Sequence, residues 1–425
     1  MVLLTGPVPS GPLPPHLAEP TLTYLDEADT EAFTAAILRG FHDDYKPDLW
    51  EPFRKVLEPD RAFGFTVGGR WIATCGAYTR SMTVPGGSVP TAAVTVVTVS
   101  PTYRRRGLLT AMMKHQLEDI HRRSEPVALL WASESLIYGR FGYGHATPRL
   151  RISGQTRSTA FVPEVDLGDG SVGEVERDEW LAAAVPLYNK LLARRPGALD
   201  RDAHWWQVRV HDPEPWRKGA AARRFALHYD KRGRVDGFAS FRVKGGDSAD
   251  NPAAEVQVGD IEAVDPSACA ALWRFLLDLD LVRTFTRENA PVDEPLRYLV
   301  ADSRMISTEL TDGTYARLVD VPAALQARTY AAELDVVIAV SDPLLRHNDS
   351  AFHVQAGPDG ANVSATRRGA DVSLSIRDLG AIYLGGTSLS SLHAAGLVGE
   401  RRTGAVAAIT AAFTAPQPPF CADHF

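Results

Sequence analysis

Apolar residues in the first quarter of the chain alternate between helical and strand spacing. Residues 29–45 repeat apolar positions at helical spacing, and Asp29 can cap that helix. Two hairpins are predicted next, over residues 62–79 with a turn at Gly68–Gly69, and over residues 80–100. The pattern therefore predicts a helix followed by antiparallel strands.

A second amphipathic helix is predicted over residues 108–123. Its apolar positions recur every three or four residues, which is the spacing of a helix face that packs into a core. These positions are Leu109, Met112, Met113, Leu117 and Ile120. A strand over residues 127–133 and a segment rich in glycine and tyrosine, 138–144, follow.

The same order of elements occurs again farther along the chain, which indicates an internal repeat. The second copy comprises a predicted helix over 178–195, strands over 222–230, 234–243 and 255–264, and a helix over 267–280. Aligning the two strand ends sets VSPT at 99–102 on VDPS at 264–267. The first copy continues YRRRG and the second continues ACAAL, so the arginines and the glycine are missing from the second copy.

A third region begins near Thr308. Its period-two patterns predict a meandering sheet, followed by helices and a tail, 416–425, that its prolines keep extended. The predicted strands cover residues 332–342, 351–357, 362–367 and 371–376, and the predicted helices cover 388–398 and 404–415.

Composition limits the classes of function. The chain has 425 residues, 45% of them hydrophobic, and a formal net charge of −7, which argues against nucleic acid as the main partner. Its three cysteines, Cys75, Cys269 and Cys421, form no CxxC pair, so we expect neither disulfides nor a metal site, and a reducing cytoplasm. Cys421 is a candidate exposed thiol. We identify no signal peptide and no stretch of transmembrane length.

The chemistry is concentrated where the strand ending at residue 99 meets the helix from residue 108. A strand-to-helix turn presents unpaired backbone N–H groups, and these together with the helix dipole favour an anion. Gly107 allows a ligand close to the backbone, while Arg104, Arg105 and Arg106 add forked donors suited to phosphate. A pyrophosphate or a nucleotide 3′-phosphate is the expected ligand. The alternative interpretation is that these residues form an ordinary basic helix start on a solvated surface and bind no ligand.

The context of this turn resembles a known family. A Val-rich strand, R-x-x-G-x, an amphipathic helix and a further strand are similar to the coenzyme A core of GNAT N-acetyltransferases. The segments VTVSPTYRRRGLLTAMM (97–113) and WASESLIYGRFGYG (131–144) resemble the Eis (enhanced intracellular survival) family. The resemblance extends through YARLVDVPAALQARTY (315–330) and LGAIYLG (379–385) along nearly the whole chain.

The resemblance implies an α+β fold of mixed α/β sheets. Two fused GNAT-like regions would be followed by a sterol-carrier-like C-terminal domain. We expect a proline-rich leader over 1–20, a catalytic, acetyl-CoA-binding GNAT domain over 21–165, a second GNAT-like domain without the coenzyme motif over 166–307, and the sterol-carrier-like domain over 308–425. The tail of that last domain would reach the active site.

The resemblance also implies roles for single residues. The cofactor-binding set is Val97, Val99, Arg104, Arg105, Gly107 and Ser133, with Arg106 as a helper. Tyr138 matches the general acid, although an aromatic residue in a Gly-rich turn can also serve packing alone, and Tyr143 receives no catalytic role. The base is expected to be the α-carboxylate of Phe425, which would order and neutralise a bound ammonium. A disordered tail is the default alternative for a chain end.

The resemblance places the substrate against Phe41, Asp43 and Phe53, which combine apolar walls with a carboxylate for a cationic amine. Ordinary core packing is the alternative for the two phenylalanines. His424 occupies a position that we associate with an acidic residue, so it would either weaken the attraction for polycations or supply a base that titrates near pH 7.

We therefore predict a cytoplasmic, acetyl-CoA-dependent N-acetyltransferase without a metal. Its expected substrates are primary amines of polycationic small molecules, aminoglycosides first, and its expected assembly is a homo-oligomer, a hexamer by resemblance. A protein-lysine or peptide acetyltransferase is one alternative. A non-catalytic protein that binds a lipid or a partner through its C-terminal region is the other.

Overall fold

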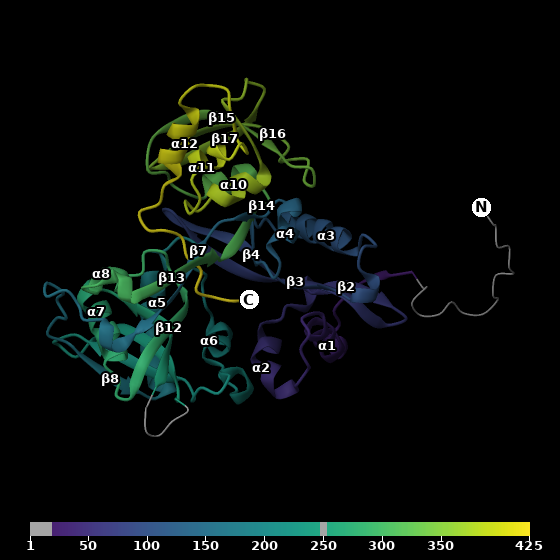
Figure 1. The fold of residues 1–425 in the computed structure, drawn as a ribbon. Coiled ribbons are helices and arrows are strands. Elements are labelled where there is room, and N and C mark those ends of the chain that lie inside the picture. Colours follow the sequence, from purple (N-terminus) through teal and green to yellow (C-terminus); the bar gives the residue numbers. More distant parts are fainter. Residues whose placement is uncertain (1–18, 247–252) are drawn as a thin grey trace, which may run out of the picture. The chain divides into compact units, whose positions relative to one another are not determined.

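A computed structural model describes residues 19–246 and 253–425 (Figure 1). The predicted leader, 1–20, lies almost entirely outside the described residues. Contacts divide the chain into two compact units. The first unit holds the residues up to Tyr78 together with Val94–Gln116, and the second holds Thr79–Ala93 together with Leu117–Phe425.

The first unit contains a hairpin covered by helices. Strand β2 (Phe63–Val67) pairs antiparallel with β1 (Thr21–Tyr24) and with the start of β3 (Arg70–Val84). The turn between β2 and β3 is at Gly68–Gly69, as predicted, and both residues have positive φ, which a two-residue type I′ turn requires. The unit also holds the end of β4 (Gly87–Val99), the start of α3 (Leu108–Arg122), α1 (Thr30–Gly40) and α2 (Pro47–Val56).

The predicted helix over 29–45 ends earlier than expected. Helix α1 stops at Gly40, whose missing side chain lets the backbone lie against Thr98 of β4, since a Cβ there would come within 2.6 Å of Thr98. His42 then turns the chain with a φ of 62°. The helical spacing would place Phe33, Ile37 and Phe41 on one face, and Phe33 and Ile37 are indeed buried, but Phe41 lies beyond the helix end and is 48% exposed.

The second unit begins with the remainder of the first sheet, whose strand order is β1-β2-β3-β4-β5-β14-β6. Strand β5 (Val127–Trp131) pairs antiparallel with β14 (Thr314–Leu318), which also pairs with β6 (Gly144–His145). The short helix α4 (Ser135–Tyr138) follows β5 and leads into a 3-10 turn, Gly139–Phe141. The apolar stripe predicted for α3 is confirmed as core packing, because Met112, Met113, Leu117 and Ile120 are fully buried.

The second sheet has the strand order β13-β7-β12-β11-β10-β9-β8. Only β11 and β12 run parallel in it, and they pair just over 254–257 and 282–286. Helix α7 packs against one face through Leu272, Trp273 and Leu276. The elements are β7 (Pro148–Gln155), β8 (Ser171–Val175), α5 (Arg177–Leu192), α6 (Ala203–Val210), β9 (Arg224–Tyr229), β10 (Val235–Lys244), β11 (Ala254–Ala263), α7 (Pro266–Leu277), β12 (Val282–Ala290), α8 (Leu296–Leu299) and β13 (Ile306–Asp312).

The third sheet has the strand order β17-β16-β15-β18-β19, with β15 and β18 parallel. Its apolar side chains, such as Ile338, Val354 and Leu374, join Ile409 in one buried core. The elements are α9 (Val321–Gln326), β15 (Leu334–Ser341), β16 (Ser350–Gly357), β17 (Gly360–Thr366), β18 (Val372–Ser375), α10 (Ile376–Ile382), α11 (Leu389–Ala394), β19 (Gly399–Glu400) and α12 (Ala405–Phe413). The strands and helices predicted for this region are confirmed to within a few residues.

Three strands pair outside the region in which the sequence analysis placed them. Strand β7 follows the first region in sequence but pairs with β12 and β13 of the second sheet. Strand β13, which crosses the predicted boundary at residue 308, belongs to the second sheet, and β14, which lies beyond that boundary, belongs to the first sheet. The third sheet begins only at Leu334. The chain therefore exchanges strands between its regions, a feature that periodicity alone does not reveal.

No helix in the described residues is long and apolar enough to cross a membrane.

Candidate active site

The turn between β4 and α3 has an unusual backbone. After β4 ends at Val99, a 3-10 turn (Pro101–Tyr103) leads to Arg105 and Gly107, whose φ angles are 63° and 82°. Residues in the left-handed region turn successive N–H groups toward one side, which creates an anion-binding concavity at the start of a helix. A Cβ on Gly107 would meet nothing within 4 Å, so this backbone faces open space within its unit.

The arginine side chains of this turn differ in their surroundings. Arg104 donates from Nε to the carbonyl of Val99 at 3.2 Å, which holds it beside the strand end. Arg106 donates to the carbonyl of Thr102 at 3.3 Å and lies 5.0 Å above the ring of Tyr103. Arg105 is exposed. Arg106 therefore stabilises the turn itself, while Arg105 extends into solvent.

Strand β4 is distorted just before this turn. Val96 has a φ of 51°, which is rare and strained for a β-branched residue. Its carbonyl accepts a hydrogen bond from Oγ1 of Thr74 at 2.7 Å, and Thr74 also contacts Oγ1 of Thr98 at 2.7 Å. These side-chain bonds hold a kink in β4 next to Val97 and Val99, the residues expected to present backbone N–H groups to the coenzyme.

The second copy of the repeat has no such turn. Helix α7 starts at Pro266, directly after Asp265, whereas eight residues separate β4 from α3. Proline at the first helical position fixes the helical φ and leaves no room for a loop. The missing arginines and glycine thus correspond to a shorter strand-to-helix connection, which lacks the anion-binding backbone.

The predicted substrate residues surround the end of α1 in the first unit. Phe41 and Asp43 follow Gly40, the residue that lies against Thr98 of β4. Asp43 is exposed, and its Oδ1 accepts the amide of Asp44 at 2.8 Å. Phe53 is half-buried on α2, with its ring 5.2 Å from that of Trp50. The α1–α2 connection therefore carries an exposed aromatic ring and an exposed carboxylate rather than a closed core.

Ser133 and Tyr138 follow β5 in the second unit. Ser133 is exposed two residues after the strand, and Tyr138 ends the short helix α4. Tyr138 is 5% exposed and its ring lies 6.2 Å from that of Tyr143, edge to face. The amide of Tyr143 donates to the carbonyl of Tyr138 at 3.2 Å. The Tyr138 ring is therefore largely buried beside Tyr143, an arrangement that is compatible with either catalysis or packing.

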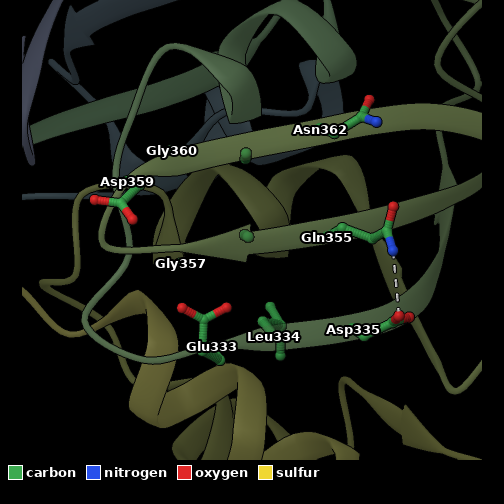
Figure 2. A pocket seen from close by; sticks show the side chains of 10 residues that line it. Glu333, Leu334, Asp335, Gln355, Gly357, Asp359, Gly360 and Asn362 are labelled. Carbon is green, nitrogen blue, oxygen red and sulfur yellow. Dashed lines mark hydrogen bonds between the residues drawn. The ribbon is translucent and has the colours of Figure 1, made fainter.

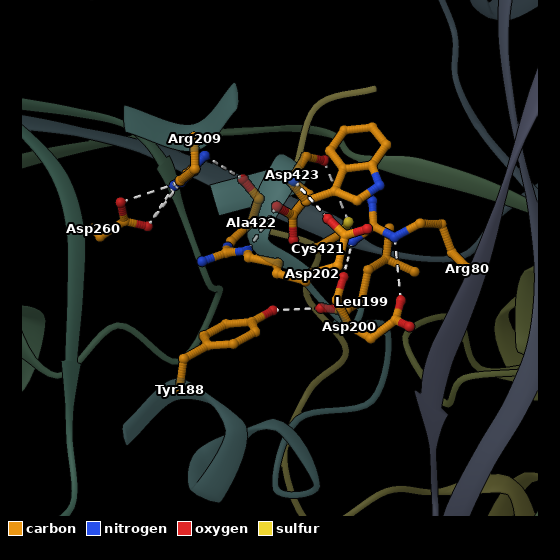
Figure 3. Close-up of polar contacts among 12 residues, drawn as sticks. Arg80, Tyr188, Leu199, Asp200, Asp202, Arg209, Asp260, Cys421, Ala422 and Asp423 are labelled. Atoms are coloured by element: carbon orange, nitrogen blue, oxygen red, sulfur yellow. Dashed lines mark hydrogen bonds and ion pairs between the residues drawn. The ribbon is translucent and has the colours of Figure 1, made fainter. Parts of the chain in front are cut away.

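The tail, residues 416–425, is docked within the second unit. Its backbone carbonyls accept hydrogen bonds from side chains of the first two sheets and their helices (Figure 3). The donor–acceptor pairs are Arg195 to Pro418 at 2.9 Å, Asn289 to Cys421 at 3.3 Å, Arg209 to Ala422 at 3.0 Å and Trp131 to Asp423 at 2.8 Å. The amide of Phe420 donates to Pro196 at 2.9 Å. The tail is therefore ordered by specific contacts.

A buried ion pair anchors the tail near its end. Arg201 donates from Nε to Oδ1 of Asp423 at 2.8 Å, and the two side chains are 1% and 5% exposed. The Arg201 guanidinium also lies 4.0 Å above the ring of Tyr188 and 4.8 Å from that of Trp206. Burial lowers the pKa of Arg201, but the charges of Asp423 and Asp260, Tyr188 and the hydrogen bond to Asp423 together outweigh that effect, so the pKa lies above its ordinary value.

Cys421 is buried beneath this pair, which corrects the interpretation of an exposed thiol. Its exposed fraction is 1%, and burial raises the pKa of the thiol to about 12. It lies in the tail between anchored residues, and its Sγ contacts the carbonyl of Asp423 at 3.4 Å. The thiol is therefore protonated and unreactive at neutral pH.

His424 stacks on Trp131 at the end of β5. The ring centroids are 4.0 Å apart, with planes 25° from parallel. Desolvation by that ring, together with the charges of Arg209 and Arg149, lowers the pKa of His424 from its ordinary value near 6.5. His424 as a whole is exposed, so solvent screens part of the effect. His424 is neutral at pH 7, and its titration lies below the neutral range that the sequence suggested.

The structure thus gathers the expected residues in two groups. The first unit contains the β4–α3 turn, the kinked end of β4 and the α1–α2 connection. In the second unit, the tail reaches Trp131 at the end of β5, and Ser133 and Tyr138 follow on the same chain segment. Phe425 is partly buried and packs against the apolar core of that unit.

Comparison with known proteins finds three domain matches along the chain. Residues 21–146 and 197–318 each match the acetyltransferase (GNAT) domain, and residues 321–422 match the sterol carrier protein domain. N-acetyltransferase Eis of Mycobacterium tuberculosis is 35% identical over 421 residues, covering 95% of this chain and 99% of the relative. The chain belongs to the Eis family of GNAT N-acetyltransferases.

Further relatives and a solved structure support this membership. An N-acetyltransferase of Streptomyces avermitilis is 41% identical over 379 residues, covering 89% of this chain and 92% of the relative. The crystal structure of Eis1 from Mycobacterium abscessus matches with a TM-score of 0.81 at 34% identity, over 96% of this chain and all of the other. The expected fold, two GNAT domains and a sterol-carrier-like domain, is thereby confirmed.

The sterol-carrier-like domain of this Eis-family chain has an open polar depression on its sheet. The depression, of about 560 Å³, lies on β15–β17 and carries the carboxylates of Glu333, Asp335 and Asp359 (Figure 2). Asp335 is engaged with His353 at 2.7 Å. An open surface with carboxylates is a poor site for a lipid, which needs an enclosed apolar cavity.

Sequence reasoning missed the residues that hold the tail of this Eis-family chain. Arg201 and Asp423 are 222 positions apart, and Trp131 is 292 positions from Asp423. The one available signal was an acidic residue in an apolar, proline-bounded tail, which suggests a buried carboxylate that needs a cationic partner. Nothing in the local pattern identifies which arginine supplies it.

Proposed function

We propose that this Eis-family N-acetyltransferase transfers the acetyl group of acetyl-CoA to primary amines of polycationic small molecules, with aminoglycosides as the leading substrates. The observation that carries the proposal is the β4–α3 turn, where two left-handed residues and two available arginines meet a helix start. Net charge supports the substrate class, because a chain of charge −7 attracts polycations.

We assign acetyl-CoA binding to the predicted N-terminal GNAT domain, 21–165. Backbone N–H groups near Val97 and Val99 would hold the pantetheine arm, while Arg105 and the turn up to Gly107 would bind the pyrophosphate. Arg104 would pivot from the Val99 carbonyl to the phosphate, since a charge-assisted bond to phosphate is stronger than a bond to a neutral carbonyl. Ser133 would contact the coenzyme from the end of β5.

Tyr138 is proposed as the general acid. Acyl transfer leaves a thiolate, and a phenol of pKa about 10 can protonate a thiolate whose thiol has a pKa of about 8.5, slightly uphill. Placement is then more important than acidity. The position of Tyr138 at the end of α4, buried against the ring of Tyr143, supports this assignment.

The α-carboxylate of Phe425 is proposed to order and neutralise the substrate ammonium, directly or through a water. An ordinary α-carboxyl has a pKa of about 3.5, too low to deprotonate an ammonium near 10 efficiently. The anchored tail supports this assignment, because a mobile carboxylate would lose orientation. His424, neutral at pH 7, would add no charge to repel the amine, and Phe41, Asp43 and Phe53 would contact the substrate.

The decisive experiment measures thiol release from acetyl-CoA with aminoglycosides, polyamines and lysine peptides. Rapid release with aminoglycosides supports the proposal, and release with lysine peptides alone favours the protein-acetyltransferase alternative. Binding of acetyl-CoA without release for any amine contradicts the substrate class. Failure to bind acetyl-CoA contradicts the whole proposal and favours the non-catalytic alternative.

A chain extension tests the terminal carboxylate separately. Adding one glycine after Phe425 moves the carboxylate by one residue, so kcat should fall while acetyl-CoA affinity is kept. Phe425→Leu is the matched control, because it changes the side chain and keeps the carboxylate in place. Equal activity of the extended protein would remove the carboxylate from the mechanism.

We also propose that the chain forms a homo-oligomer, a hexamer by its resemblance to the family, and works in a reducing cytoplasm. Light scattering coupled to size exclusion measures the assembly directly. A monodisperse monomer at working concentration would contradict that part of the proposal.

A further inference from the structure

The second GNAT domain carries a pocket that the proposed function does not use. It has a volume of about 510 Å³ and lies on the polar face of β10, β11, β12 and β7. Neighbouring side chains of these strands, such as Val256 and Phe285, are not part of the lining and join the core beneath α7. One rim is formed by the 3-10 turn Glu214–Arg217.

The pocket collects positive charge. Five cationic side chains line it, namely Arg151, Arg217, Lys218, Arg223 and Arg242. Carboxylates balance this charge only partly. Glu288 on the lining lies 3.1 Å from Arg151, and Asp212 beside the pocket pairs with both Arg217 and Arg242. Glu255 lies next to the lining and accepts hydrogen bonds from Gln257 and Thr286. Five cations against these three carboxylates leave an excess of two positive charges.

Arg223 lies close to two further arginines of the second sheet and its helices, Arg242 and Arg209. Burial, together with the charges of Arg242 and Arg209, lowers the pKa of Arg223 to about 10, although Asp260 and Asp212 oppose the shift. Its NH1 donates to the carbonyl of Arg209 at 2.7 Å, which is a neutral acceptor. The two carboxylates that oppose the shift are already paired with other arginines, Asp260 with Arg209 and Asp212 with Arg217 and Arg242. Like charges gathered in a concave site raise the local anion concentration.

The side chains of the pocket suit a phosphate rather than a bare halide. Gln257 has one amide N–H beyond the hydrogen bond that it donates to Glu255, and Trp216 adds an aromatic wall. The hydroxyls of Ser240 and Thr286 also line the pocket, but they already donate to Asp260 and Glu255. Guanidinium groups match the oxygens of a phosphate in pairs, whereas a monatomic ion makes no use of that geometry. The lining thus combines charge, forked donors and a flat apolar surface.

We propose that this pocket binds a small anion of the phosphate-ester or pyrophosphate class, carrying at least two negative charges. The pocket is distinct from the β4–α3 turn, because it lies on the second sheet, whereas β4 belongs to the first sheet. It also differs from the place where a second coenzyme would bind in the repeat, since it lies on the faces of β10–β12 and not at the start of α7. The inference stands independently of the acetyl-transfer proposal.

Titration calorimetry with inorganic pyrophosphate tests the proposal on the full chain. The β4–α3 turn would also bind pyrophosphate, so the measurement uses the Arg104→Ala, Arg105→Ala protein as background. We expect saturable binding there that weakens steeply with salt. In that background Arg223→Gln should raise Kd at least about tenfold, as the loss of one charge-assisted bond implies, and Arg223→Lys should restore part of the affinity.

Two further variants guard against misfolding and non-specific charge effects. The rim pair Arg151→Gln, Lys218→Gln removes two charges at exposed positions and should also weaken binding. Arg232→Gln removes an exposed charge outside the pocket and should leave Kd unchanged. Absence of binding in the Arg104→Ala, Arg105→Ala background would overturn the proposal. The proposal would also be overturned if Arg232→Gln weakened pyrophosphate binding as much as the rim pair does, because that result would indicate only diffuse charge attraction.

Discussion

Replacing Asp423 by alanine should release the tail while the rest of the protein stays folded. The substitution removes the one carboxylate that pairs with Arg201, whose side chain is 1% exposed. Removing one partner of a fully buried pair costs about 3–5 kcal/mol, because an uncompensated charge remains in a low-dielectric site. The rings of Tyr188 and Trp206 around the guanidinium offset part of that cost.

The size of this loss can be compared with what else holds the tail. Its other polar anchors are five hydrogen bonds to or from the backbone of residues 418–423. At about 0.5–1.5 kcal/mol net each, they contribute about 2.5–7.5 kcal/mol together. A loss of about 3–5 kcal/mol is of the same size, so the tail should open frequently. Solvent would then reach Arg201, which limits the destabilisation to the docking free energy of the tail.

Hydrogen–deuterium exchange followed by mass spectrometry measures this opening directly. The amide of Phe420, which donates to Pro196, should lose about 100-fold or more of its protection, the factor that about 3 kcal/mol implies. Amides of β15 and β16 should be unchanged. Asp178→Ala is the matched control, since Asp178 pairs with Arg177 on the surface and is 86% exposed.

Unchanged protection of the tail in Asp423→Ala would refute the reasoning, because it would show that the ion pair does not hold the tail. The double variant Arg201→Leu, Asp423→Leu adds a second check. It leaves no unpaired charge, so its tail should be better protected than that of Asp423→Ala. Thiol release measured alongside should follow tail protection if the terminal carboxylate serves catalysis.

Three other predictions concern the active site. Tyr138→Phe should lower kcat by about 100- to 10,000-fold with little change in acetyl-CoA affinity, because it removes a positioned proton donor and keeps the ring; equal kcat would exclude Tyr138 as the acid. Arg104→Ala with Arg105→Ala should raise the Kd of coenzyme A at least about tenfold, since charge-assisted bonds to phosphate are lost; an unchanged Kd in direct binding would contradict the pyrophosphate assignment. The folded-state pKa of His424 lies below its ordinary value, so the unfolded chain binds its proton more readily and tail docking should weaken as pH falls below about 6.5. Emission from Trp131 should fall over that range in the native protein but not in His424→Gln, and the same pH dependence in both proteins would remove His424 as the cause.

Much of the local structure followed from the sequence because short-range physics fixes it. The Gly68–Gly69 turn, the apolar stripe of α3 and the strands of the third sheet depend on neighbours within a few residues. The β4–α3 turn could likewise be recognised, because its arginines and its glycine are contiguous in sequence with the strand pattern before them and the helix pattern after them. The length of α1 was overestimated, because the contact that ends the helix at Gly40 comes from Thr98 on a distant strand.

The sequence by itself determined the family, the repeat and the absence of an anion-binding turn from the second copy. Tertiary structure decided which strands join which sheet, because β7 and β14 pair by matching edges far from their sequence neighbours. It also decided how the tail is held. Arg201, Trp131 and Asp423 meet only once three regions have folded, and long-range pairing of a buried charge leaves no periodic signal in the chain.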